Sequence, residues 1–169
     1  DALQALDRVA AAIAALRNVA EAEPESLAAH LSLAGALRRA ERWEESTGVY
    51  DVAIALIDPI EQRHWAVFYE RGIAHERAGL WDEAEADFFK ALELEPELPH
   101  VLNYLGYSWV EQRRNFERAQ AMIEKAVEQR PEDGYITDSL GWVLYRIGKF
   151  EEAVPHLERA VELKPTDPI

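Results

Sequence analysis

The sequence predicts an all-α protein built from repeated pairs of helices. Ala, Leu, Glu and Arg, all good helix formers, dominate it, and no stretch alternates polar and apolar residues as a strand does. Four segments share an aromatic residue, two charged residues and a small residue: WEES, WDEA, FERA and FEEA. Their small residues, at positions 46, 84, 119 and 153, are 38, 35 and 34 residues apart, and this near-constant spacing indicates an internal repeat.

Each of these segments begins the second helix of a pair. An apolar or aromatic residue follows four positions after the small residue and an alanine follows seven positions after it, so all three lie on one helical face. The residues concerned are Tyr50 and Ala53, Phe88 and Ala91, Ile123 and Ala126, and Leu157 and Ala160. A proline lies near the end of each helix and is expected to stop it.

A second small residue lies 12 or 13 positions before each of the first set, at Ala34, Gly72, Gly106 and Gly141. Glycine inside a helix costs about 1 kcal/mol relative to alanine. Three of the four repeats accept that cost at the same place, so we expect the two helices of a pair to approach closely there.

The first half of the chain holds the more divergent elements. Residues 1–24 predict an alanine-rich amphipathic helix, either the second helix of a truncated repeat or a cap. Residues 25–64 predict the first complete repeat, in which Ser46 replaces the small alanine. Residues 65–98 predict the second repeat, in which Arg71 stands where the later repeats have leucine.

The second half holds the more regular repeats. Residues 99–133 predict the third repeat, with one extra residue in its turn, where Asn115 stands near the usual glycine and tolerates the left-handed conformation. Residues 134–169 predict the fourth repeat, with Gly148 ending its first helix and Pro165 stopping its second. No capping helix follows, so the last helix is expected to show one apolar face.

The residue spacing that the repeats share is also found in a known protein family. The fourth repeat carries Leu140, Gly141, Ala153, Leu157, Ala160 and Pro165, and the third carries Leu105, Gly106, Ala119, Ile123, Ala126 and Pro131. In these residues and their spacing the chain, over about residues 25–165, resembles the tetratricopeptide repeat (TPR) family. The resemblance implies a right-handed superhelix of antiparallel helical hairpins, whose first helices line a concave groove.

The groove implied by this resemblance predicts a binding site for a peptide or protein segment. The projected site residues are Arg38, Arg39, Tyr69, Arg77, Asn103, Tyr104, Tyr107, Tyr135, Asp138, Trp142, Tyr145 and Arg146. Tyr, Trp and Arg are enriched at binding hot spots, and the arginines are expected to pair with carboxylates of the partner. The alternative is that individual tyrosines pack against a neighbouring helix and expose only an edge.

One known use of TPR grooves does not match. Some members hold the C-terminal tail of cytosolic chaperones with a clamp of Lys and Asn, but the corresponding positions here hold Leu31, Gly35, Glu70, His100 and Tyr104. Residues 99–169 look instead like the C-terminal repeats of longer bacterial TPR proteins. Some of those are exported or attached to the outer membrane, and some deliver substrates to periplasmic proteases. This likeness implies a bacterial origin and a periplasmic or outer-membrane-associated location. The absence of cysteine leaves a cytoplasmic location equally open.

Composition argues against several classes of partner. The net charge of −14 over 169 residues repels nucleic acid, and no apolar run approaches the roughly 20 residues of a membrane span. No cysteine is present, so neither a disulfide nor thiolate chemistry is available. The chain begins at Asp1 rather than methionine, which predicts a processed chain or a fragment.

No pattern in the sequence predicts catalysis, a metal or a cofactor. Glycine-rich phosphate loops and nucleophile elbows are missing, and the five histidines share no ligand spacing such as HExxH. We therefore expect a non-enzymatic scaffold or adaptor. The alternative function is a structural module that self-assembles into homo-oligomers through its terminal helices.

Overall fold

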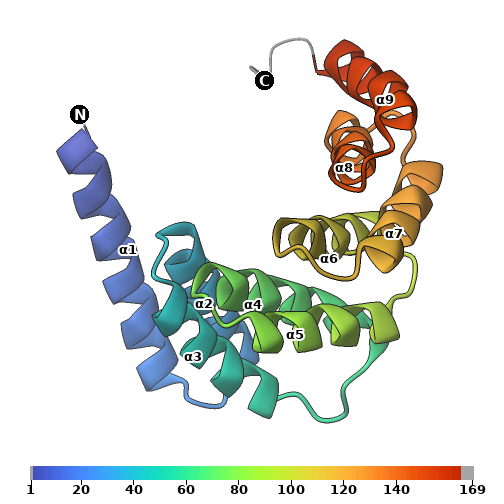
Figure 1. Cartoon of the computed structure of the whole chain (residues 1–169). Coiled ribbons are helices and arrows are strands. Elements are labelled where there is room, and N and C mark those ends of the chain that lie inside the picture. Colours follow the sequence, from blue (N-terminus) through green and yellow to red (C-terminus); the bar gives the residue numbers. More distant parts are fainter. Residues whose placement is uncertain (1, 165–169) are drawn as a thin grey trace. The chain divides into compact units, whose positions relative to one another are not determined.

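The chain is helical, as the all-α prediction required (Figure 1). The computed structural model describes residues 2–164, apart from the side chains at positions 2, 3, 5 and 6. Over this range there are nine α-helices and one short 3-10 helix, and no strand. The predicted stop at Pro165 and the rest of the tail lie outside the described residues.

The helices fall into two compact units, Asp1–Glu95 and Pro96–Ile169. The first unit holds α1 (Ala2–Ala22), α2 (Leu27–Arg39), α3 (Trp43–Ala55), η1 (Gln62–His64), α4 (Trp65–Arg77) and α5 (Trp81–Leu94). The second holds α6 (Pro99–Glu111), α7 (Phe116–Gln129), α8 (Gly134–Arg146) and α9 (Phe150–Leu163). Helices α2 and α3, α4 and α5, α6 and α7, and α8 and α9 pack as hairpins, and successive hairpins inside each unit also touch.

The two helices of a hairpin approach closely at the predicted glycines. A Cβ atom built on Gly72 would lie 2.7 Å from Phe88, one on Gly106 would lie 2.8 Å from Ile123, and one on Gly141 would lie 2.6 Å from Leu157. These distances are far shorter than a van der Waals contact, so no larger side chain fits without a shift. The expectation that glycine is kept here for close packing is confirmed.

Each hairpin turns through a residue in the left-handed conformation. The residue is Gly79 (φ 80°) in the second hairpin, Gly148 (φ 84°) in the fourth and Glu41 (φ 58°) in the first. In the third hairpin Arg113 (φ 57°) takes this place, since its amide bonds to the carbonyl three residues earlier as in the other turns. Asn115 is also left-handed (φ 52°), as predicted, but it is the additional residue directly before α7 and not the equivalent of the glycine.

Side-chain caps fix the start of two first helices. Ser26 accepts a hydrogen bond from the Ala29 amide, at 3.3 Å, and begins α2. Asp133 accepts from the amides of Tyr135 and Ile136, at 3.0 and 3.2 Å, and begins α8. These caps satisfy amides that a helix leaves unpaired at its first turn, so they set the phase in which each first helix presents its side chains.

Candidate functional site

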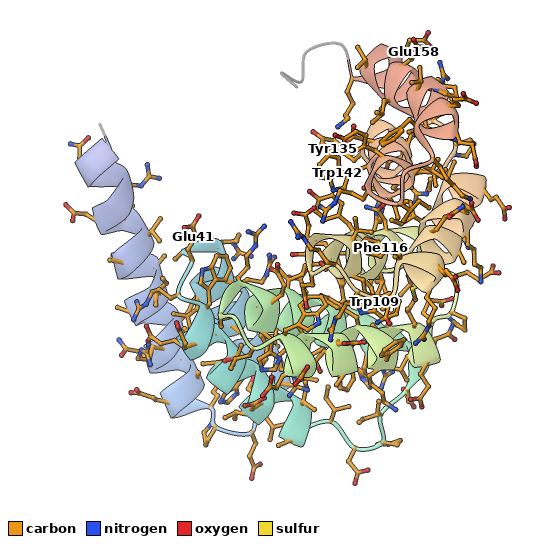
Figure 2. The ribbon with its side chains drawn as sticks, viewed as in Figure 1. Glu41, Trp109, Phe116, Tyr135, Trp142 and Glu158 are labelled. Atoms are coloured by element: carbon orange, nitrogen blue, oxygen red, sulfur yellow. The ribbon has the colours of Figure 1, made fainter. Side chains whose placement is uncertain are left out.

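Exposed aromatic side chains gather on the first helices of the second unit. Tyr107 of α6 is 40% exposed, and Tyr135 and Tyr145 of α8 are 65% and 49% exposed. The Lys164 ammonium lies 3.3 Å from the centre of the Tyr135 ring and holds that ring from one side. Figure 2 shows Tyr135 and Trp142 on α8 together with Glu158 on α9, which is also exposed. Large exposed aromatic groups are costly to hydrate, so this surface is a candidate for contact with a partner.

A carboxylate orients the tryptophan of this surface. Trp142 Nε1 donates a hydrogen bond of 2.7 Å to Glu111 Oε1, and Arg146 donates one of 3.2 Å to the same oxygen. The Arg146 guanidinium also lies 5.3 Å from the Trp142 ring centre, and Tyr145 stacks on that ring at 5.5 Å. The indole is therefore held between α6 and α8 before any partner arrives.

The same contacts change the expected role of Arg146. The sequence predicted that its guanidinium would meet a partner's carboxylate, but Glu111 of the same unit already neutralises it. Asp138 and Glu111 also surround Tyr107, whose pKa is raised by burial first and by these two carboxylates next. A protonated tyrosine hydroxyl is a hydrogen-bond donor as well as an acceptor, so Tyr107 presents both.

Two further predicted residues of α6 are less accessible. Asn103 and Tyr104 are both half-buried. The Asn103 side-chain oxygen is buried and has no hydrogen-bond partner within the part of the chain that is described. Buried acceptors are nearly always satisfied in folded proteins, so this oxygen is an exception, but its burial keeps it from direct contact with a partner.

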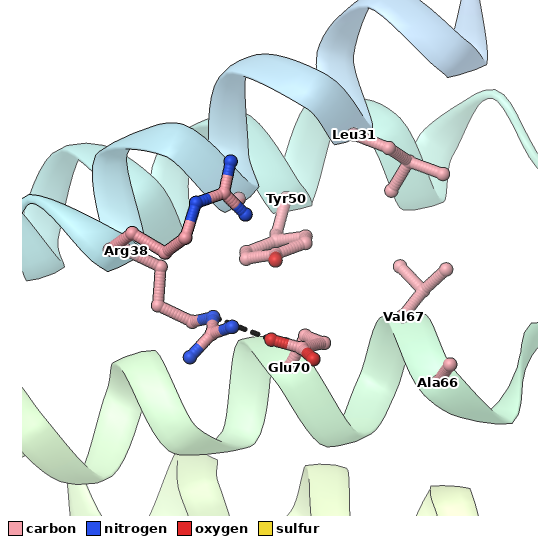
Figure 3. A pocket seen from close by; sticks show the side chains of 8 residues that line it. Leu31, Arg38, Tyr50, Ala66, Val67 and Glu70 are labelled. Carbon is pink, nitrogen blue, oxygen red and sulfur yellow. Dashed lines mark ion pairs between the residues drawn. The ribbon is translucent and has the colours of Figure 1, made fainter. Parts of the chain in front are cut away.

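In the first unit a pocket lies between α2 and α4. It has a volume of about 270 Å³ and is lined by Leu31, Gly35, Arg38, Arg39, Tyr50, Ala66, Val67 and Glu70 (Figure 3). The predicted residue Arg38 forms an ion pair with Glu70 across the pocket, and Arg39 lies beside it. Apolar side chains fill the other end, where Leu31 faces Ala66 and Val67.

The remaining predicted residues of this unit are not part of the pocket. Tyr69 is half-buried, and its ring lies 6.2 Å from that of Phe88 and 6.3 Å from that of Trp65. Burial, followed by the nearby Glu70 carboxylate, raises its pKa. Arg77 is exposed near the end of α4 and lies 3.4 Å from Glu76. Tyr69 therefore matches the packing alternative considered for the tyrosines.

Three residues that were not predicted from the sequence also belong to these surfaces: Tyr50, Glu70 and Glu111. Tyr50 belongs to the packing ladder and is buried, yet it also lines the pocket. Glu70 and Glu111 lie on first helices, in the face that was projected, but carry the charge opposite to the arginines that were selected. Their position on that face is the one signal in the sequence, and it does not show that they pair with Arg38 and Arg146.

Other kinds of site find no support in residues 2–164. No three acidic or histidine side chains come together there in a way that would hold a metal ion. None of the helices in this range combines the length and the apolar character needed to cross a membrane.

Helical hairpins whose first helices carry exposed aromatic and charged side chains define a repeat module for protein–protein interaction. The chain belongs to the tetratricopeptide repeat family, whose model matches residues 1–59 and 110–168. The family match does not delimit individual repeats, so the four repeat boundaries stay predictions.

A relative and two solved structures agree with this assignment. The TPR repeat-containing protein PA4667 of Pseudomonas aeruginosa is 31% identical over 99 residues, which are 59% of this chain but only 17% of that protein. MamA 41-end from Desulfovibrio magneticus RS-1 has a TM-score of 0.82 at 18% identity, with 99% of this chain and 93% of that one covered. YrrB, described as a TPR protein with an unusual peptide-binding site, has a TM-score of 0.75 at 16% identity, with 97% and 82% covered. At these identities the structures establish the fold alone.

Proposed function

We propose that the chain is a non-enzymatic adaptor that binds a peptide or protein segment on the first helices of its hairpins. The observation that carries this proposal is the aromatic surface of the second unit, Tyr107, Tyr135, Trp142 and Tyr145. Its tryptophan is already oriented by Glu111 and stacked on Tyr145. A rigid aromatic group loses little conformational entropy on binding, which is why such groups anchor interfaces.

The kind of partner follows from the polar groups around these rings. Glu111, Asp138 and Tyr107 offer acceptors, and Tyr107 also offers a donor. Exposed rings beside such groups suit a segment with alternating apolar and polar side chains, bound in an extended or helical form. YrrB is described as having a peptide-binding site, and this likeness in fold supports the same class of ligand here.

A comparative pull-down tests the proposal. The baits are the wild-type chain, a variant with Tyr107→Ala, Trp142→Ala and Tyr145→Ala, and a control with Val52→Ala, Val154→Ala and Val161→Ala. The three valines are exposed on second helices, at 46%, 51% and 47%. A partner retained by the wild type and the valine control but lost by the aromatic variant supports the proposal, provided that circular dichroism shows all three folded. Equal recovery by all three contradicts it.

Self-assembly through the terminal helices is the second candidate function. Val154 and Val161 lie seven residues apart on one side of α9, and Val9 and Val19 of α1 are 44% and 45% exposed. Exposed apolar residues on both terminal helices would suit end-to-end pairing of copies. The solution mass at tens of micromolar discriminates, since a monomer that still retains its partner excludes this route.

A further inference from the structure

Two glycines inside helices of the first unit, Gly35 of α2 and Gly48 of α3, have no packing reason to be there, and Gly35 lines a pocket. Gly72, Gly106 and Gly141 leave less than 3 Å for a Cβ atom, so packing explains them. A Cβ atom on Gly35, inside α2, would meet nothing closer than the flexible end of Arg39, at 3.4 Å, an ordinary contact. Glycine destabilises a helix interior by roughly 0.5–1 kcal/mol relative to alanine. Packing does not explain that cost at Gly35 or Gly48, but the pocket beside Gly35 offers a role for it.

The position of Gly35 indicates that role. It lines the pocket between α2 and α4, and a Cβ atom there would point at the Arg39 guanidinium and come within 4.0 Å of the Tyr50 hydroxyl. The missing side chain thus opens a path to both polar groups. Tyr50 is 3% exposed, and the surface that it shows lines this pocket together with Gly35.

The charges of the pocket suit a single anion. Two arginines, Arg38 and Arg39, and one carboxylate, Glu70, line it, which leaves one net positive charge. Glu70 pairs with Arg38, as the dashed line in Figure 3 marks, so Arg39 carries the uncompensated charge. Such a positive site is unusual in a chain with a net charge of −14.

The tyrosine adds a hydrogen-bond donor beside this charge. Burial, followed by the Glu70 carboxylate, raises the pKa of Tyr50, so its hydroxyl keeps its proton at neutral pH. An arginine and a neutral hydroxyl together bind a carboxylate by charge-assisted hydrogen bonds. At the other end of the pocket, Leu31, Ala66 and Val67 would contact aliphatic groups.

We propose that this pocket receives the side-chain carboxylate of a Glu or Asp within the bound segment, with Arg39 as its ionic partner and Tyr50 as its hydrogen-bond donor. The inference rests on the proposed function and specifies the chemistry of its ligand. A side chain fits better than a chain terminus, because α-carboxylates are usually captured by backbone amides. At the Arg39 end of the pocket, Gly35 and Tyr50 lie in the interiors of α2 and α3, where backbone amides are already bonded within the helices.

The test measures the binding of three N-acetylated tripeptides to the whole chain. The probes are acetylated Leu-Glu-Leu amide, acetylated Leu-Gln-Leu amide and acetylated Leu-Gln-Leu with a free C-terminus. Each is titrated into ¹⁵N-labelled protein while the amide signals of Gly35, Arg39, Tyr50 and Glu70 are followed. The Glu peptide is expected to shift these signals with a Kd about tenfold or more below those of both Gln peptides, which is typical of a charge-assisted bond.

Single substitutions in and outside the pocket show whether the Glu peptide binds there. Gly35→Ala and Arg39→Gln are expected to weaken the Glu peptide about tenfold, to the level of the Gln peptides. Gly48→Ala is the matched control, because Gly48 also lies inside a helix of this unit and has open space around it. It should bind like the wild type, while both alanine variants gain similar helix stability.

The outcomes separate this inference from the proposed function. Equal Kd values for the Glu and Gln amides, tightest binding by the free-terminus peptide, or unchanged binding by Gly35→Ala and Arg39→Gln would each overturn the pocket assignment. The aromatic variant of the second unit is tested separately by pull-down. If only that variant loses the partner, the proposed function stands without the pocket.

Discussion

Arg71 of α4 donates two hydrogen bonds to Asp87 of α5, from Nε at 2.9 Å and from a terminal nitrogen at 2.6 Å. Asp87 is 3% exposed, and its Oδ2 is also within hydrogen-bond distance of His75 Nδ1, at 3.0 Å. Burial lowers the pKa of Arg71, but the bonds and charge of Asp87, helped by Asp51, outweigh it and raise the pKa above its ordinary value. Arg71 stands where the later repeats have leucine, and Asp87 of the facing helix α5 supplies the carboxylate that this buried arginine needs.

In the third repeat the equivalent positions hold an apolar pair, Leu105 and Met122. The same repeat architecture therefore accepts leucine and methionine where the second repeat has the ion pair. Arg71→Leu leaves Asp87 with His75 as its remaining partner, and Asp87→Met leaves Arg71 with the exposed Asp51. Each should lower the free energy of unfolding, by up to about 3–5 kcal/mol. The double variant should recover most of that loss, because apolar residues of similar volume often substitute for a buried pair, but not the part due to the buried His75, which loses Asp87. Urea unfolding of the four proteins measures the coupling, and additive losses would contradict it.

Close packing of the hairpins makes a second prediction. Gly141→Ala places a Cβ atom 2.6 Å from Leu157 and should lower the free energy of unfolding by about 1–3 kcal/mol. Gly48→Ala meets no atom within 4 Å and should raise it by about 0.5–1 kcal/mol. Thermal unfolding followed by circular dichroism compares them, and the same sign for both would refute the packing argument.

The N-cap residue Asp133 stabilises the start of α8, the helix that carries most of the aromatic surface. Asp133→Ala removes the acceptor for two amides and should cost about 1 kcal/mol of stability. Asp133→Asn keeps a side-chain oxygen and should lose much less. Chemical unfolding is the measurement, and an equal loss in both variants would mean that the cap geometry is not the cause.

Alkaline pH provides a further prediction. The pKa of Tyr50 is raised, chiefly by burial, so the folded state holds this proton more tightly than the unfolded state. Its contribution to stability is therefore complete below the ordinary tyrosine pKa of about 10 and is lost as the pH rises through the folded value. The stability difference between the wild type and Tyr50→Phe should stay constant from neutral pH to about pH 9 and shrink above pH 10. A difference that does not change with pH would disprove the linkage.

The helical pairs were predictable because their signals are local. The glycines at 72, 106 and 141 and the alanines 12 or 13 residues later reveal the hairpins without knowledge of any distant contact. Polar residues were harder to interpret. The left-handed place in the third turn is taken by Arg113, a residue type that gives no glycine-like signal.

The ion pairs across first helices were not predictable from the pattern. Arg38 meets Glu70 and Arg146 meets Glu111, residues 32 and 35 positions apart in the chain. Such pairs depend on how one hairpin is rotated against the next, and on the reach of long side chains, neither of which is encoded in a local period. The projected face carries the exposed rings of Tyr107, Tyr135 and Tyr145, but a projection does not tell a charge offered to a partner from one already paired.

Site-specific photo-crosslinking tests the central claim most directly. Benzoylphenylalanine is placed singly at Tyr107, Tyr145 or Val161, and the chain is irradiated in an extract containing its partner. If the partner binds on the first helices of the second unit, positions 107 and 145 crosslink to the same partner, and position 161, on the exposed side of α9, does not. Crosslinks from position 161 alone, to a partner or to a second copy of the chain, would contradict it.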